Sequence, residues 1–138
     1  MSPEAMIAVA GSVIIITTFA FVLYKKAPKR VRRTKFTKKW RDIQQLCADK
    51  SNWPQAVMLA DQLLDSVLKK RNKPGKTMGE RMVSAQNNFT NNDAVWQAHK
   101  LANHIRSHED QSKNPLNETD VKAALVAFRQ SLRDLGAL

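Results

Sequence analysis

The stretch Trp53–Arg71, WPQAVMLADQLLDSVLKKR, carries the clearest structural signal in the chain. Its apolar residues recur at spacings of three and four, as they do along one face of an amphipathic helix. They form one wide stripe: Ala56, Val57, Ala60, Leu63, Leu64, Val67 and Leu68. Pro54 suits the first turn of a helix, and Lys69 and Lys70 suit the last turn, because cations there meet the negative end of the helix dipole. The stretch therefore predicts a long helix with one face buried.

The same periodicity on either side predicts four further helices. One runs from Phe36 to about Lys50, one opens at the capping box of Thr77 and Glu80, one runs from Ala94 to about His108, and one is capped by Asn117. Their expected core residues are Phe36, Trp40, Ile43, Leu46 and Cys47; Met78, Met82, Ala85 and Phe89; Val95, Ala98, Leu101, Ala102 and Ile105; and Val121, Ala124, Leu125, Phe128, Leu132 and Leu135. No segment has the alternation of a strand. We therefore expect an all-α fold, a small antiparallel bundle of about five helices.

Ahead of this bundle, residues 5–24 contain no charged side chain. Twenty helical residues span roughly the 30 Å of a bilayer's hydrocarbon core. A secretory signal peptide would need positive charge before such a segment and a small-residue cleavage site after it, and the chain has neither. We therefore expect a single transmembrane helix over residues 5–24, behind a short extracytoplasmic N-terminus at residues 1–4.

The positive charge of the chain is concentrated directly after this segment. The formal net charge is +11, and residues 25–41 hold ten Lys or Arg and no acid, so the remaining chain after residue 41 is close to neutral. Positive flanks stay in the cytoplasm, which places the helical bundle of residues 37–138 inside, behind a basic linker at residues 25–36. Cations next to a membrane also attract anionic lipid head groups. The candidates for that contact are Lys25, Lys26, Lys29, Arg30, Arg32 and Arg33.

Two pairs of polar residues have a spacing that can bind a metal. Asp61 and Asp65 lie four residues apart on the 53–71 helix, and His104 and His108 lie four apart on the 94–108 helix. No matching ligands accompany either pair, so we interpret the aspartates as partners of basic neighbours and the histidines as solvated imidazoles. We therefore expect no metal and no cofactor.

One polar strip on the 94–108 helix could carry chemistry. Trp96, His99, Asn103 and Arg106 follow one another at spacings of three and four, beside the apolar face. A histidine in such a strip could act as a general base. We regard these residues as the first candidates for a site.

Three segments together resemble one family. The first is Trp53-x-x-Ala56-Val57 with Ala60-Asp61-x-Leu63-Leu64-Asp65, the second is Gly75-x-Thr77-x-Gly79-Glu80-Arg81, and the third is Val95-Trp96-x-Ala98-His99-Lys100-Leu101-x-Asn103-x-Ile105. In this order they are similar to the HEPN-type helical domains (higher eukaryotes and prokaryotes nucleotide-binding) found behind a bacterial membrane anchor. The resemblance covers about residues 40–138. It implies location at a bacterial inner membrane. It also implies a relation to metal-independent ribonucleases that use an arginine, a polar residue and, four to six positions after the arginine, a histidine. Asn103 matches the polar residue and His108 the histidine, but Ala102 stands at the arginine position.

These observations lead to one main hypothesis and two alternatives. The main hypothesis is a single-pass membrane protein that presents a non-catalytic HEPN-like domain to the cytoplasm for binding or assembly with an unidentified partner. The first alternative is a membrane-tethered ribonuclease of toxin or defence type that cleaves RNA through His108, Asn103 and either Arg106 or His99; the family's active site usually needs two copies, which implies a homodimer. The second alternative is a scaffold for anionic lipid surfaces, in which the basic strip is the functional part. Met58, Leu59 and Ser66, opposite the core stripe, are the expected partner surface.

Overall fold

The structure is a computed structural model that describes residues 2–3, 16–18, 20, 33–107 and 115–138 of the chain. The chain divides into two units, Met1–Thr34 and Lys35–Leu138. Every regular element among the described residues is helical. The prediction of an all-α bundle is therefore confirmed for the second unit.

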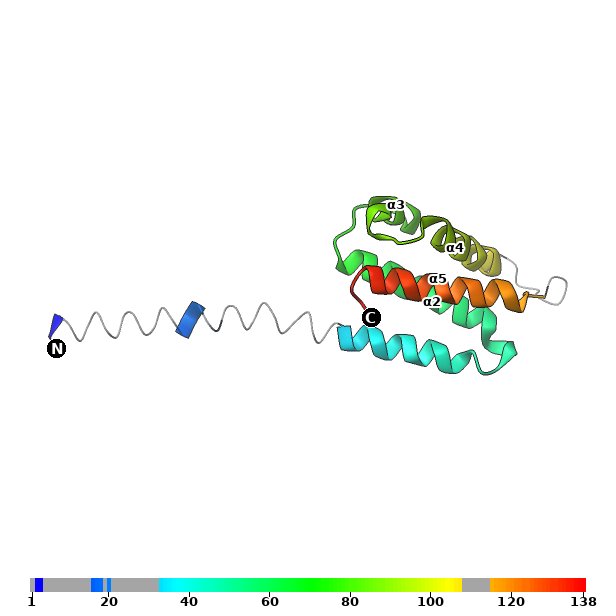
Figure 1. Cartoon of the computed structure of the whole chain (residues 1–138), viewed down its shortest axis with the longest axis horizontal. Helices are drawn as coiled ribbons and strands as arrows, with labels where there is room; N and C mark the ends of the chain where they lie inside the picture. The colour runs from blue at the N-terminus through cyan, green and yellow to red at the C-terminus, as the bar shows by residue number, and fades with distance from the viewer. Residues whose placement is uncertain (1, 4–15, 19, 21–32, 108–114) are drawn as a thin grey trace. The chain divides into compact units, whose positions relative to one another are not determined.

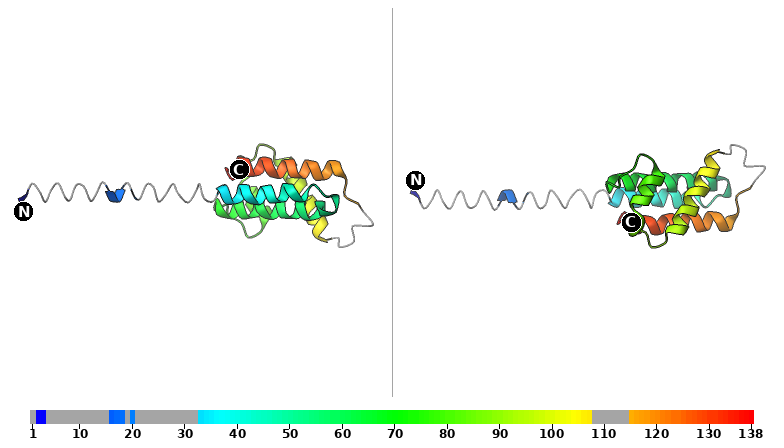
Figure 2. Two further views of the ribbon diagram at one scale, coloured as in Figure 1. Left: turned by 90° about the horizontal axis from the view of Figure 1, so that it is seen from below. Right: turned by 90° about the horizontal axis from the view of Figure 1, so that it is seen from above.

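Five α-helices and two 3-10 turns make up residues 33–107 and 115–138. An N-terminal helix at residues 33–46 is followed by η1 (Lys50–Asn52), α2 (Trp53–Lys70), α3 (Met78–Ser84), η2 (Gln86–Asn88), α4 (Asn92–Ser107) and α5 (Glu118–Asp134). The N-terminal helix, α2, α4 and α5 alternate in direction along the chain (Figures 1 and 2). The connection at residues 47–52 between the N-terminal helix and α2 is short, which favours an antiparallel arrangement of these two helices.

The prediction that the fold includes a transmembrane helix is contradicted by the described helices. No helix in the part of the chain that the structure describes is both long and apolar enough to cross a bilayer. The longest helix among the described residues is α2, at 18 residues, and it carries the charged residues Asp61, Asp65, Lys69 and Lys70. Most of the segment at residues 5–24, and residues 25–32 of the basic linker, lie outside the described residues.

The core is built around α2, which packs against α3, α4 and α5. All seven residues of its predicted stripe are buried. The expected faces of the other helices also point inward, with most of their residues buried and Leu46, Cys47, Met78, Leu101 and Leu125 half-buried against the core. The half-buried Cys47 thiol donates to the Ile43 carbonyl oxygen, and burial raises its pKa, which argues against a role as a nucleophile.

The third helix is shorter than the sequence pattern predicted. α3 ends at Ser84, and the 3-10 turn η2 then carries the chain to the buried Phe89. The turn contains Asn87 and Asn88, and asparagine side chains compete with the helical backbone for hydrogen bonds. Phe89 therefore reaches the core from a turn and not from the predicted helix face.

Candidate functional site

An open pocket of about 680 Å³ lies between α2, the start of α3 and α4. Its polar lining includes Asp61, Asp65 and Lys69 from α2, Thr77 from the N-cap of α3, and His99, Asn103 and Arg106 from α4. Residues 99, 103 and 106 are spaced by four and three, so they lie on one face of α4 and reach the same pocket. The structure thus brings together three of the four residues proposed for the ribonuclease site.

Four of these side chains form a closed ring of hydrogen bonds, which we call the polar ring. Asp61 Oδ1 lies 2.7 Å from His99 Nδ1, and Asp61 Oδ2 accepts from Arg106 Nη2 at 2.5 Å. Asn103 Nδ2 lies 3.2 Å from His99 Nε2, and Asn103 Oδ1 accepts from Arg106 Nη1 at 2.8 Å. The ring joins α2 to α4 through side chains 38 and 45 residues apart in the sequence.

The chemistry of the ring assigns the proton of His99. A guanidinium can only donate, so the Asn103 carbonyl oxygen must face Arg106 and the Asn103 amide nitrogen must face His99. An amide nitrogen donates, so His99 Nε2 accepts and carries no hydrogen. The ring proton of His99 therefore sits on Nδ1 and is donated to the Asp61 carboxylate. The polar ring is fully satisfied when His99 is neutral.

Asp61 is the most buried charged group of the site, with 1% of its side chain exposed. An isolated carboxylate in such a position is strongly unfavourable, and it is tolerated where it is paired and hydrogen-bonded. Arg106 and His99 supply those partners. His99 is itself held by Trp96, whose ring packs edge-on at a centroid distance of 6.0 Å and an interplanar angle of 74°.

A second ionic cluster lines the neighbouring part of the pocket. Asp65 Oδ1 accepts from Arg81 Nε at 2.8 Å and lies 2.7 Å from Arg81 Nη2 in an ion pair, and Asp65 Oδ2 pairs with Lys69 at 2.8 Å. Partial burial alone would raise the pKa of Asp65, but the hydrogen bonds and positive charges of Lys69 and Arg81 outweigh it and lower that pKa. Arg81 also donates from Nη1 to the carbonyl oxygen of Gly75 at 2.9 Å, which fixes the loop between α2 and α3.

Gly75 is required at its place in that loop. Its φ of +147° is a conformation that residues with a side chain rarely adopt. A Cβ atom there would also lie 2.7 Å from the Arg81 backbone nitrogen. The turn at Gly75 therefore brings its carbonyl oxygen to Arg81, whose guanidinium joins this loop to Asp65 of α2.

The interpretation of Asp61 and Asp65 as partners of basic neighbours is confirmed. Helical spacing nevertheless did not predict that Asp61 is the centre of the polar ring. A signal was present, because Asp61 lies four residues after Val57 and three before Leu64, which places it on the buried stripe. A charged residue at a core position indicates a buried partner.

The remaining predicted site residues lie elsewhere. His108 is outside the described residues, as are Lys25, Lys26, Lys29, Arg30 and Arg32, whereas Arg33 is described and exposed. Ala102, at the family's arginine position, is fully buried in the core and does not line the pocket. The position that would correspond to the arginine of the resembled family is therefore occupied here by a residue that packs in the core.

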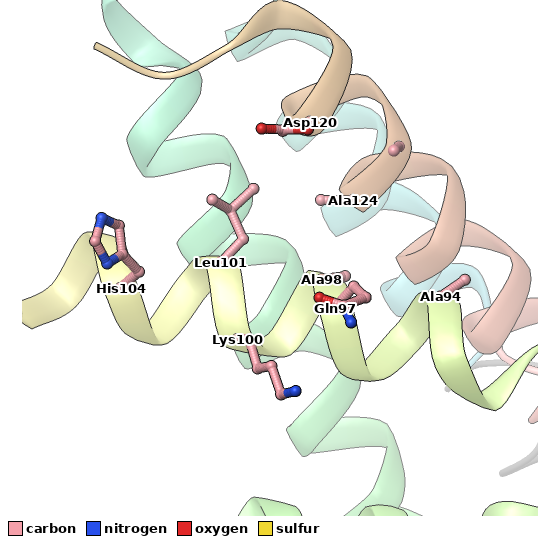
Figure 3. A pocket seen from close by; sticks show the side chains of 9 residues that line it. Ala94, Gln97, Ala98, Lys100, Leu101, His104, Asp120 and Ala124 are labelled. Atoms are coloured by element: carbon pink, nitrogen blue, oxygen red, sulfur yellow. The ribbon is translucent and has the colours of Figure 1, made fainter. Parts of the chain in front are cut away.

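Two further hollows lie on other faces of the bundle. One of them, of about 540 Å³, lies between α4 and α5. Figure 3 shows it with His104 and Asp120 near one end and Leu101, Ala98 and Ala124 along it. A smaller hollow of about 300 Å³ between the N-terminal helix and α2 is lined in part by Leu59 and Ser66. Met58 and Leu59, two of the expected partner contacts, are half-buried and pack against the core. Neither hollow holds a ring of interlocked polar side chains like the one at Asp61.

No cluster of three or more His, Cys, Asp or Glu within the described ranges could hold a metal ion. Comparison with known protein families, curated proteins and solved structures finds no match to this chain. The HEPN-like resemblance therefore stays a prediction. The candidate site is defined by its own geometry, which is a mixed polar pocket with a buried aspartate at its base.

Proposed function

We propose that the helical domain is a non-catalytic, HEPN-like binding module whose binding site is the pocket between α2, α3 and α4. The observation that supports this proposal is the closed polar ring. Both ring nitrogens of His99 and both carboxylate oxygens of Asp61 are already engaged by protein groups. These side chains therefore hold the shape of the pocket, and a partner would bind to the surface that they support.

The placement of Ala102 also supports a non-catalytic role. In an active enzyme of the resembled family, the arginine at this position is expected to stabilise the charge of the reacting phosphate. Here the position is occupied by a small residue that is fully buried. Arg106 is the nearest arginine in sequence, but it is committed to Asp61 and Asn103.

A metal-independent ribonuclease is the second candidate, and the contact between His99 and Asp61 favours it. A carboxylate that accepts from Nδ1 fixes the tautomer of a histidine and leaves Nε2 to act as a general base. Asn103, which covers Nε2, is exposed and could be displaced by a substrate hydroxyl. In this reading, Arg106 would contact the phosphate.

The two candidates are separated by incubating the full chain with mixed RNA in the presence of a chelator. The wild type is compared with His99→Asn and with the control His104→Asn, which changes a histidine of α4 outside the pocket. The binding module predicts intact RNA with all three proteins. If the wild type and the control cleave RNA and His99→Asn does not, the ribonuclease would replace the binding module as the proposed function.

The binding site itself is tested by capturing partners on the immobilised full chain. Arg106→Gln changes the pocket wall, and Lys100→Gln removes one cation from the same helix on the side of the pocket in Figure 3. We expect a bound partner to be lost with Arg106→Gln and retained with Lys100→Gln. Equal retention by both variants would place the binding site elsewhere on the domain.

A further inference from the structure

The polar ring is closed only in one protonation state of His99. Arg106 fixes the orientation of the Asn103 amide, and that orientation requires His99 Nε2 to accept a hydrogen bond. Histidine is the side chain that gains a proton in the physiological pH range. A proton added to His99 goes to Nε2, because Nδ1 already carries one.

The protonated ring cannot keep all four hydrogen bonds. With a hydrogen on Nε2, the Asn103 amide nitrogen faces another donor. If the Asn103 amide turns over, its oxygen faces His99, but its nitrogen then faces the Arg106 guanidinium, which is also a donor. Either orientation of the amide places one donor against another, so one hydrogen bond of the polar ring must break, and because both contacts of Asn103 are exposed the freed donor turns to water.

The charges around His99 do not remove this conflict. On α2, Asp61 faces Nδ1 directly, and Asp65 and Lys69 line the same pocket but pair with each other. On α4, Arg106 shares the Asp61 carboxylate, and the uncharged Trp96 packs against the imidazole. Thr77, Met78 and Gly79 of the third wall carry no charge. Asp61 attracts a protonated His99, but the positive charge of Arg106 already balances that carboxylate.

Asn103 is the member of the ring that can move. Its side chain is exposed to solvent, whereas Asp61 and His99 are held between helices, with 1% and 12% of their side chains exposed. We propose that His99 is a proton-controlled latch: in its neutral form it holds Asn103 at the pocket wall, and in its protonated form it loses the hydrogen bond to Asn103, which then keeps Arg106 as its one partner in the polar ring and can turn away from that wall. The latch rests on the proposed binding function, because it regulates access to the same pocket.

The latch is tested on the full chain, without any ligand, by nuclear magnetic resonance of 15N-labelled protein between about pH 5 and about pH 8. At the upper end we expect His99 with a proton on Nδ1 and none on Nε2. As the pH falls, we expect the Asn103 side-chain amide signals to change with the same midpoint as the His99 ring. Unchanged Asn103 signals through the His99 titration would overturn the latch, and so would a His99 ring that does not titrate in this range.

A substitution at Asn103 gives the sharper comparison. In Asn103→Asp, the carboxylate accepts from both Arg106 and a protonated His99 Nε2, so the ring closes in the protonated state and the His99 midpoint moves to higher pH. Gln97→Asp, an exposed position on the same helix, adds the same charge away from the ring. A His99 midpoint that is the same in both variants would overturn the latch. Because no partner is added, this result is independent of whether the capture experiment finds one.

Discussion

Arg81 illustrates how a single charged residue can hold two elements and a loop together. Its side chain is 9% exposed, and its guanidinium bonds to Asp65 of α2 and to the Gly75 carbonyl oxygen. Replacing Arg81 with Met should lower the free energy of unfolding by about 3 kcal/mol, because it leaves the Asp65 carboxylate with one partner fewer in a partly buried place. Denaturant unfolding of the full chain measures this loss.

Lys69 is the matched control for Arg81, since it pairs with the same carboxylate. Its side chain is 60% exposed, and exposed ion pairs contribute about 1 kcal/mol or less. Lys69→Met should therefore change the free energy of unfolding far less than Arg81→Met. If the two substitutions were equally costly, burial would not be the reason for the strength of the Arg81 contact.

The lowered pKa of Asp65 predicts a loss of stability in acid. Partial burial opposes ionisation of Asp65, but the hydrogen bonds and charges of Lys69 and Arg81 favour it more strongly, so the folded-state pKa lies below the unfolded-state value of about 3.9. The resulting stabilisation is present above the unfolded-state pKa and is lost as the pH falls through the folded-state pKa. Asp65→Asn should therefore lower the free energy of unfolding at neutral pH. Below about pH 4, the free energy of unfolding of this variant should depend less steeply on pH than that of the wild type.

At the scale of the elements, α3 depends on its N-terminal cap. The helix has 7 residues, and its first turn is closed by a capping box in which Thr77 Oγ1 accepts from the Glu80 nitrogen and Glu80 Oε2 accepts from the Thr77 nitrogen. Thr77→Ala should cost about 1 kcal/mol, whereas Thr77→Ser, which keeps the hydroxyl, should cost much less. Thermal unfolding of both variants measures the difference, and equal midpoints would mean that tertiary contacts alone hold α3.

The elements also show how far the sequence could predict the fold. The stripe of α2, the cap of α5 at Asn117 and the capping box of α3 are local signals, and the structure confirms each of them. The early end of α3 depends on whether its backbone hydrogen-bonds within the helix or to asparagine side chains. The spacing of apolar residues does not predict the outcome of that competition. The transmembrane prediction used the length, apolarity and flanking charges of residues 5–24, and no described helix is both long and apolar enough to cross a bilayer.

The candidate site was predictable only in part, for a related reason. His99, Asn103 and Arg106 share a face of α4, and helical spacing is enough to group them. Asp61 belongs to the same site because it contacts His99, which lies 38 residues later in the sequence and on another helix. The spacing of residues within one helix carries no information about such a pair. The burial of Asp61 on the core stripe was the one local sign that a basic partner must lie opposite.

At the scale of the whole molecule, the buried apolar residues from Phe36 to Ala137 form one hydrophobic cluster. Every member of that cluster belongs to the unit Lys35–Leu138. About a hundred residues with one continuous core are enough for an independently folding domain. We therefore expect a protein consisting of residues 35–138 to be helical by circular dichroism and to unfold in one cooperative transition, with a midpoint close to that of the same domain in the full chain.

Two substitutions on α5 show whether that transition reports the packed core. Phe128 is fully buried, so Phe128→Ala in residues 35–138 should lower the free energy of unfolding by about 3–5 kcal/mol. Val126 is 68% exposed on the same helix, so Val126→Ala should change it by about 0.5 kcal/mol or less. A gradual, non-cooperative loss of helix in the unsubstituted residues 35–138 would contradict the independent domain, because it would mean that its core needs contacts from the preceding residues.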